Sequence, residues 1–308
     1  MTLHPARLIP IVGLAMDNRN RIQFARPDLE TLARQFTAVD MHFHSRFSDG
    51  ACHVDQIAAR CKALGIGIAL TDHNAISGAV ELDRIGGLLS IPGIEVTSAE
   101  GTHVLVYFYD IEALQVFFND TVRPFMGPAT MSSTSLTMEQ IVASARRHPS
   151  VIVFPHPYSA AYTGICSLQF PQGRRDLLLE AVDGVEVINA GNMKRWNLQS
   201  ALLGFNLDKA ITAGSDGHRI DELGGAVAYA DSPAERKAFL DAIKLKRNKV
   251  IGRESAILKK MRSNSGKLRH NFKNYPDLME KNIRYSYTVL NATSRKLRQR
   301  VKDRLKSA

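Results

Sequence analysis

The sequence has 308 residues, of which 44% are hydrophobic and 23% are charged, and its formal net charge is +10. This composition is ordinary for a soluble globular protein, and the length allows one large domain with an extension or two domains. No apolar run approaches the ~20 residues that cross a bilayer, so no transmembrane segment is expected.

The N-terminal residues and the cysteines both favour a cytoplasmic protein. The apolar run over residues 8–16 is short, is interrupted by proline and glycine, and lacks a basic lead and a small-residue cleavage site. It therefore does not have the pattern of a signal peptide. Cys52, Cys61 and Cys166 are an odd number of cysteines without a Cys-x-x-Cys spacing. We expect reduced structural thiols and a cytoplasmic location.

The pattern of apolar residues predicts an N-terminal extension over residues 1–37, with a short helix near its end, followed by alternating strands and helices. Strands are expected at residues 39–43, 66–71, 88–96, 104–109, 151–154, 184–189, 209–215 and 224–229, and helices at residues 54–64, 76–85, 137–147 and 233–246. Residues 111–136 are expected to form a helix and an exposed loop. The alternation argues for a parallel sheet with helices outside it. Functional groups of closed barrels gather at the carboxyl ends of the strands.

His42 and His44 lie at the end of the first of these strands. Alternate side chains of a strand point to the same face, so the two imidazoles can hold one cation. The Ser-Asp-Gly turn that follows can bring the carboxylate of Asp49 to the same place. Imidazole nitrogen together with carboxylate oxygen suits Zn, Mn or Fe. Taken alone, His-x-His is a weak signal, because two histidines on a strand face are often only a polar strand end.

Further residues that can bind a metal lie where later strands meet loops. They are His73 in Thr-Asp-His-Asn, Glu95 in Gly-Ile-Glu-Val, His103 in Thr-His-Val-Leu, His156 in Phe-Pro-His-Pro, and Asp216 and His218 in Ser-Asp-Gly-His. Only His103 is expected near the start of a strand. Together with His42, His44 and Asp49, these residues form nine positions that resemble, in order and in local motif, the ligand set of the PHP family, named for polymerase and histidinol phosphatase. The resemblance covers about residues 38–252.

The resemblance implies an α/β fold, namely a distorted (β/α)7 barrel of about seven strands over residues 38–252. It also implies a trinuclear site that holds two or three divalent metal ions, which would be Mn, Zn or Fe. In the family pattern one metal is held by His42, His44, Glu95 and Asp216, a second by Glu95, His103 and His156, and a third by Asp49, His73 and His218. Asp72 is expected to orient a ligand histidine.

Two metals ~3.5–4 Å apart can share a hydroxide and hold the oxygens of a phosphoryl group. We expect Asp216 to guide the proton of the nucleophile, with His218 beside it and Arg219 facing the substrate, so these three are the predicted catalytic residues. The predicted substrate contacts are Arg46, Asn189, Lys194 and Arg195. The family often has an asparagine at the position of Asn189, whereas solvated charges are the plainer interpretation of Lys194 and Arg195.

A long loop over residues 157–173 is expected at the mouth of the barrel, followed by Arg174 and Arg175. Its aromatic residues and the two arginines have two interpretations. They either stack a base and hold a phosphate, or they pack the loop and leave the arginines solvated.

Residues 253–308 are predicted to form a basic helical extension. Residues 261–308 contain 13 Lys and Arg against 3 Asp and Glu, whereas residues 1–260 contain 27 of each. Apolar residues at 283, 287, 290, 297, 301 and 305 form one stripe on a helix over about residues 278–306, and the other face is basic. Three interpretations stay open: packing on the barrel or on a second subunit of a homo-oligomer, attraction to nucleic-acid phosphates, and attachment to an anionic membrane surface.

The predicted function is a metal-dependent phosphoesterase that attacks a phosphate ester with a metal-activated hydroxide. The predicted substrate is a small phosphorylated metabolite or a nucleotide. One alternative is an exonuclease that acts on short nucleic acid and uses the basic extension for affinity. The other alternative, from a different class, is a non-catalytic metal-binding interaction module.

Overall fold

The computed structural model describes residues 21–159, 163–166 and 170–254. Its strands are β1 (Ile22–Gln23), β2 (Thr37–Phe43), β3 (Gly67–Leu70), β4 (Ser90–Thr97), β5 (His103–Phe108), β6 (Ser150–Phe154), β7 (Gly184–Asn189), β8 (Ala210–Gly214), β9 (Ala226–Ala230) and β10 (Lys249–Gly252). Its helices are α1 (Leu29–Gln35), α2 (Val54–Leu64), α3 (Ser77–Ile85), α4 (Ile111–Phe117), α5 (Met138–Ala145), α6 (Gln172–Ala181), α7 (Lys194–Asn206) and α8 (Arg236–Lys244).

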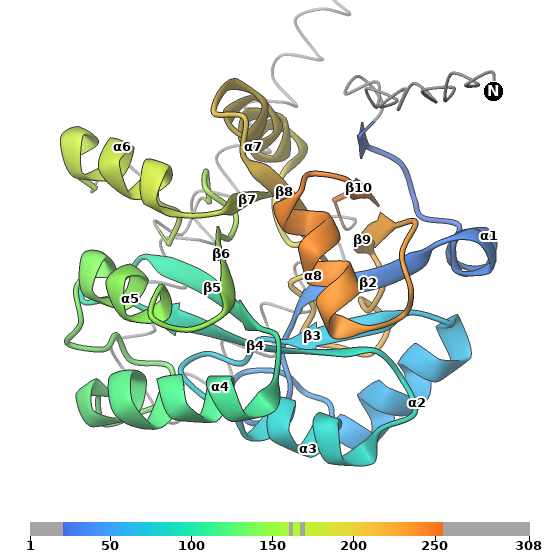
Figure 1. The fold of residues 1–308 in the computed structure, drawn as a ribbon, viewed down its shortest axis with the longest axis horizontal. Coiled ribbons are helices and arrows are strands. Elements are labelled where there is room, and N and C mark those ends of the chain that lie inside the picture. Colours follow the sequence, from blue (N-terminus) through green and yellow to red (C-terminus); the bar gives the residue numbers. More distant parts are fainter. Residues whose placement is uncertain (1–20, 160–162, 167–169, 255–308) are drawn as a thin grey trace, which may run out of the picture.

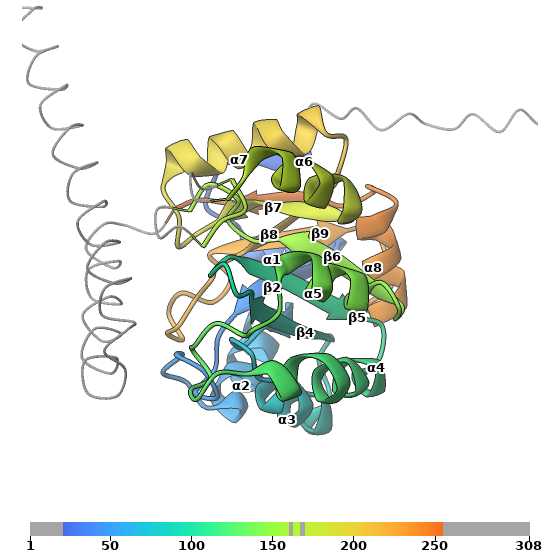
Figure 2. The ribbon, with the colours of Figure 1, turned by 90° about the vertical axis from the view of Figure 1, so that its left-hand side faces the viewer.

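All the strands belong to one ten-stranded sheet in the order β1-β10-β9-β2-β3-β4-β5-β6-β7-β8. The helices lie around the outside of this curled sheet (Figure 1). In the second view, α6 and α7 lie at one end of the molecule, and α2 and α3 lie at the other (Figure 2). Most of the predicted helices bury the apolar faces that their sequences indicate. In α8, for example, Phe239, Leu240 and Ile243 are buried.

The sheet curls until the end of β8 meets β2. The backbone N–H of Asp216 donates to the carbonyl of His42 at 2.8 Å, and the N–H of His44 donates to the carbonyl of Gly217 at 2.9 Å. The seven strands β2 to β8 therefore form a distorted barrel, and β9, β10 and β1 continue the sheet beyond β2. This confirms the predicted α/β fold of the (β/α)7 type.

The sheet is not wholly parallel. Strand β5 is antiparallel to β4 and β6, and β9 is antiparallel to β2 and β10. The prediction of a parallel sheet is wrong for these two strands. The link between β4 and β5 consists only of residues 98–102. So short a link can join antiparallel strands, whereas parallel neighbours need a crossover of a dozen residues or more. Because β5 runs in the opposite direction, its first residue, His103, lies at the same edge as the ends of the other strands.

Helices α6 and α7 were not predicted, and α7 shows why. It turns Asn197, Ser200 and Gly204 towards the sheet, whereas Leu198 and Phe205 are exposed. A β-carbon on Gly204 would already contact side chains of β7 and β8, so small residues let this helix approach closely. The pattern that marks an amphipathic helix is therefore absent from this face.

Two predictions fall wholly outside the described residues. They are the basic helix over residues 278–306 and the apolar run over residues 8–16. Within the described residues, none of the helices has the length and apolar character needed to cross a membrane.

Asp40 links β2 to the segment that follows β8. Its buried carboxylate accepts hydrogen bonds from the backbone N–H of Ser215 (2.9 Å), the hydroxyl of Ser215 (2.6 Å) and the backbone N–H of Gly224 (2.9 Å). Burial raises the pKa of Asp40 to about 6, because these hydrogen bonds offset only part of the cost of burying the charge.

This pKa predicts a pH-dependent stability. An unfolded aspartate has a pKa of about 4, so between pH ~4 and ~6 the folded state holds a proton that the unfolded state has lost. The contribution of Asp40 to the free energy of unfolding therefore decreases as the pH rises through this range. In urea denaturation with EDTA, we expect the free energy of unfolding of the wild type to fall by about 1 kcal/mol more than that of Asp40→Asn between about pH 5 and pH 7.5. An equal change in both proteins would contradict the prediction.

Candidate metal centre

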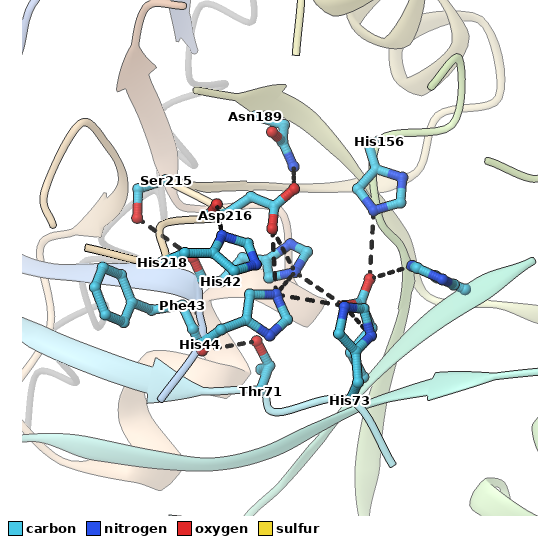
Figure 3. Close-up of polar contacts among 12 residues, drawn as sticks. His42, Phe43, His44, Thr71, His73, His156, Asn189, Ser215, Asp216 and His218 are labelled. Atoms are coloured by element: carbon cyan, nitrogen blue, oxygen red, sulfur yellow. Dashed lines mark hydrogen bonds and ion pairs between the residues drawn. The ribbon is translucent and has the colours of Figure 1, made fainter. Parts of the chain in front are cut away.

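The nine residues predicted as metal ligands come together at one end of the barrel, and we call them the ligand cluster. His42 and His44 come from β2 and the residue after it, Asp49 from the next turn, His73 from the end of β3, Glu95 from β4, His103 from the start of β5, His156 from the end of β6, and Asp216 and His218 from the segment after β8. Figure 3 shows the side chains of His42, His44 and Asp216 converging.

Two imidazole nitrogens and two carboxylate oxygens of this cluster lie close to one another. The Nε2 atoms of His42 and His44 lie 3.1 Å apart. Glu95 Oε2 lies 3.4 and 3.5 Å from these two nitrogens, and Asp216 Oδ1 lies 3.6 and 3.2 Å from them. Two ligands held about 2.0–2.2 Å from one tetrahedral ion lie about 3.3–3.6 Å apart. The distances from either carboxylate oxygen to the two imidazole nitrogens are of this size, and His42, His44 and Glu95 form a group that could hold one divalent ion.

Glu95 is placed to share a second ion. Its Oε2 accepts no hydrogen bond from the described residues, although nitrogens of His42, His44 and His73 lie 3.0–3.5 Å away. Its Oε1 lies 2.8 Å from His103 Nδ1 and 3.3 Å from His156 Nε2. A buried carboxylate oxygen without a hydrogen bond costs stability unless another positive group faces it. A cation would meet that need, and His73, Glu95 and His103 form a group that could hold one, whereas the structure does not group His156 with them.

The third predicted group is more open. His218 Nε2 lies 3.0 Å from Asp49 Oδ2, but His73 Nε2 lies 4.0 Å from Asp49 Oδ1. His44 Nδ1 is also near, at 3.7 Å from Asp49 Oδ1. Asp49 and His73 could therefore hold an ion with His44, and His218 could do so with His44 and Asp216.

Both central carboxyl groups are ionised at neutral pH. Burial by itself raises the pKa of Glu95, but His103 and His73 lower it well below its ordinary value. Burial likewise raises the pKa of Asp216, but His42 and His44 lower it well below its ordinary value. The cluster thus offers anionic oxygens to a cation.

The imidazoles differ in charge. Burial lowers the pKa of His42, but the carboxylates of Asp216, Glu186 and Glu95 outweigh burial and raise it well above its ordinary value. Burial lowers the pKa of His73 to about 3, and Glu95 offsets only part of this effect. His73 is therefore neutral and ready to bind a metal, whereas a metal must displace a proton from His42.

Hydrogen bonds orient two of the ligand imidazoles. His42 Nδ1 lies 3.1 Å from Glu186 Oε1, and His218 Nδ1 lies 2.9 Å from the carbonyl oxygen of Asp216. Each acceptor favours a proton on Nδ1 and leaves Nε2 with a lone pair. In both residues Nε2 is the nitrogen that faces the cluster.

Two ligand residues have a strained backbone. His156 and Asp216 have φ values of 30° and 48°, in the left-handed region that costs a residue with a side chain on the order of 1 kcal/mol or more. The N–H of His156 donates to Glu186 Oε2, and that of Asp216 donates to the carbonyl of His42. Such strain is typical of residues that the surrounding structure holds in place for function.

The predicted catalytic and substrate residues lie in different surroundings. Arg46 and Arg219 are exposed and contact His53 and Asp221, respectively. Lys194 and Arg195 are exposed in the first turn of α7, where Arg195 stacks on Trp196. Asn189, by contrast, is buried and donates to Glu186 and Asp216. Its amide thus donates a hydrogen bond to one of the predicted ligands, Asp216.

Two expectations need correction. Arg174 and Arg175 lie on α6 rather than in a loop, and Arg174 pairs with Glu100 and Glu139, so it serves packing. Asp72 was expected to orient a ligand histidine. Its carboxylate instead accepts from the backbone N–H and the hydroxyl of Ser45 and from the hydroxyl of Ser48, and it thereby holds the turn that carries Asp49.

Glu186 is the residue near the cluster that the sequence prediction missed. It lies in the middle of β7, where every residue is buried. The available signal was a charged residue within the otherwise apolar run Gly-Val-Glu-Val-Ile, because an unpaired carboxylate is rarely buried.

The family comparison agrees with this geometry. Residues 40–122 match the family model described as the PHP domain. A segment of 74 residues is 40% identical to the 3′,5′-nucleoside bisphosphate phosphatase of Chromobacterium violaceum, and the match covers 22% of this chain and 25% of that protein. The chain thus matches about a quarter of the length of this relative.

Solved structures extend the likeness in fold. A two-domain protein from Bacteroides vulgatus, which contains a predicted PHP-like metal-dependent phosphoesterase, is similar with a TM-score of 0.53 at 17% identity, over 80% of this chain and 72% of that one. The lesion-specific endonuclease of Pyrococcus furiosus is similar with a TM-score of 0.56 at 18% identity, over 70% of this chain and 57% of that one. At these identities the likeness shows the fold alone. Together, the family match over residues 40–122 and the shared fold confirm the resemblance to the PHP family that was stated from the ligand residues.

Proposed function

We propose that the chain is a metal-dependent phosphoesterase that hydrolyses a phosphate ester with water as the nucleophile. The observation that carries this proposal is the convergence of His42, His44, Glu95 and Asp216, in which each carboxylate lies within 3.6 Å of both imidazole nitrogens. Divalent ions at such a site lower the pKa of water and neutralise charge on phosphoryl oxygens. The non-catalytic alternative has less support because all nine donor residues are present and the carboxylates of Glu95 and Asp216 are ionised.

Asp216 is the residue best placed to receive the proton of the nucleophile. The exposed fraction of its side chain is 23%, compared with 1% for Glu95 and 6% for Asp49. Its pKa is lowered by the neighbouring imidazoles, so it is a carboxylate at neutral pH. Asn189 holds its other oxygen, Oδ2, at 3.2 Å. We propose His218 and Arg219 beside it as the other catalytic residues, with Arg46, Lys194 and Arg195 supplying positive charge to the phosphate.

The proposed substrate is a small phosphorylated metabolite or nucleotide. The partial identity with a nucleoside bisphosphate phosphatase supports it. An exonuclease activity is the second candidate, favoured by the excess of 10 positive charges in residues 261–308.

We also propose that the phosphoesterase domain spans residues 38–252 and holds two or three Mn, Zn or Fe ions. We propose a reducing cytoplasmic location, which agrees with the free thiols of Cys52, Cys61 and Cys166.

Replacing His42 tests the proposed chemistry. The variant His42→Ala removes one donor of the group formed with His44 and Glu95, so turnover of a nucleoside 3′,5′-bisphosphate with added Mn should fall at least about a hundredfold. The measurement is phosphate release by protein that has been stripped with EDTA and reloaded. His148→Ala is the matched control, because this half-buried histidine precedes β6 at the opposite end of the barrel and should keep its activity. Equal activity of wild type and His42→Ala would refute the proposal.

Removing residues 261–308 separates the two candidate substrates. If the basic extension supplies affinity for nucleic acid, its loss should abolish the shortening of a 5′-phosphorylated oligoribonucleotide and leave hydrolysis of the bisphosphate unchanged. The measurement is a gel assay beside phosphate release, each at low and high salt. Oligonucleotide activity that persists in the shortened chain would exclude this role of the extension.

A further inference from the structure

Glu186 is a buried carboxylate with unusual surroundings. Its side chain is fully buried in β7. Burying a carboxylate costs several kcal/mol unless its oxygens are well paired. Its partners are an imidazole, a backbone N–H and a carboxamide, and all three belong to residues beside or within the ligand cluster. The protein therefore buries this charge directly beside the predicted metal ligands.

One oxygen of Glu186 determines which nitrogen of His42 faces the cluster. Glu186 Oε1 lies 3.1 Å from His42 Nδ1, and a carboxylate can only accept a hydrogen bond. The proton of a neutral His42 is therefore held on Nδ1. Its Nε2, which is 3.1 Å from His44 Nε2, then presents its lone pair to the centre.

The other oxygen of Glu186 reaches two further ligands. Oε2 accepts from the backbone N–H of His156 at 2.9 Å, where φ is strained to 30°. It also accepts from Asn189 Nδ2 at 2.8 Å, and the same amide nitrogen donates to Asp216 Oδ2 at 3.2 Å. A single carboxylate thus connects ligands from β2, from the end of β6 and from the segment after β8.

We infer that Glu186 is the positioning residue of the metal centre, which sets the tautomer of His42 and holds His156 and Asp216 in place for the ions. Glu186 does not itself touch a metal or a substrate. This inference rests on the metal centre of the proposed function and deepens it. Its physical basis is that a carboxylate behind a ligand imidazole fixes the ring orientation and makes the ligand nitrogen more basic.

The substitution Glu186→Gln reverses the direction of the hydrogen bond to His42 Nδ1 and keeps the shape of the side chain. Two donors, from His156 and Asn189, face the position of Oε2, so the glutamine carbonyl takes that position. Its NH2 group then faces His42 Nδ1 and can only donate. The proton of His42 moves to Nε2, where it faces the centre and opposes binding of a metal.

The first experiment compares metal affinity and stability in the full-length protein. Titration of the metal-free protein with Mn and with Zn should give a dissociation constant about 10–100-fold higher for Glu186→Gln than for wild type. The melting temperature of the metal-free variant should stay close to that of wild type. Glu180→Gln, an exposed carboxylate on α6, is the matched control and should change neither quantity. Unchanged affinity of the folded Glu186→Gln variant would overturn the inference. If the metal-free variant is unfolded, the second experiment decides.

A second experiment requires no change at position 186. In Zn-loaded wild-type protein labelled with ¹⁵N, long-range proton–nitrogen spectra report which ring nitrogen of each histidine carries the proton, and His42→Ala assigns the signal. We expect the proton of His42 on Nδ1. A proton on Nε2 would overturn the inference even if Glu186→Gln fails to fold.

The outcomes also separate this inference from the proposed function. Wild-type protein that binds Mn and Zn but hydrolyses no phosphate ester would contradict the proposed function. The metal titration and the nitrogen spectra would still decide the role of Glu186. Wild-type protein that binds neither ion would overturn both.

Discussion

The close approach of β8 to β2 is the constraint on which the rest of the structure depends. A β-carbon on Gly214 would lie 2.3 Å from the β-carbon of His42, so only glycine permits this contact. The approach lets the segment after β8 bond to the backbone of β2 and brings Asp216 to His42 and His44. Without it the sheet would remain open, and the ligands of its two ends would lie apart.

Closure also concentrates buried charge. Glu95 and Asp216 are ionised among imidazoles that compete for the same protons, and the backbone of His156 and Asp216 is strained. Without bound metal, buried charges and strained backbone of this kind lower the free energy of unfolding. Divalent ions would replace the shared protons and satisfy Glu95 Oε2, which supports a functional rather than a structural origin for the cluster.

Much of the ligand cluster could be predicted because its members are encoded locally. The alternation of side chains along β2 places His42 and His44 on one face, and most other ligands follow the end of a strand. The reversed direction of β5 was missed, although the short link over residues 98–102 could have indicated it. Helix α7 was missed because small polar residues face the sheet and leucines face outwards.

The sequence by itself indicated the α/β class of fold through its local patterns, and its motifs indicated the nine candidate ligands through their resemblance to the PHP family. Only the tertiary structure decided which polar groups meet. Glu186 lies 144 residues from His42, and Asp40 lies 175 residues from Ser215. Asp72 turned out to hold Ser45 and Ser48 rather than a histidine. No local pattern encodes such pairs, because the closure of the barrel brings them together.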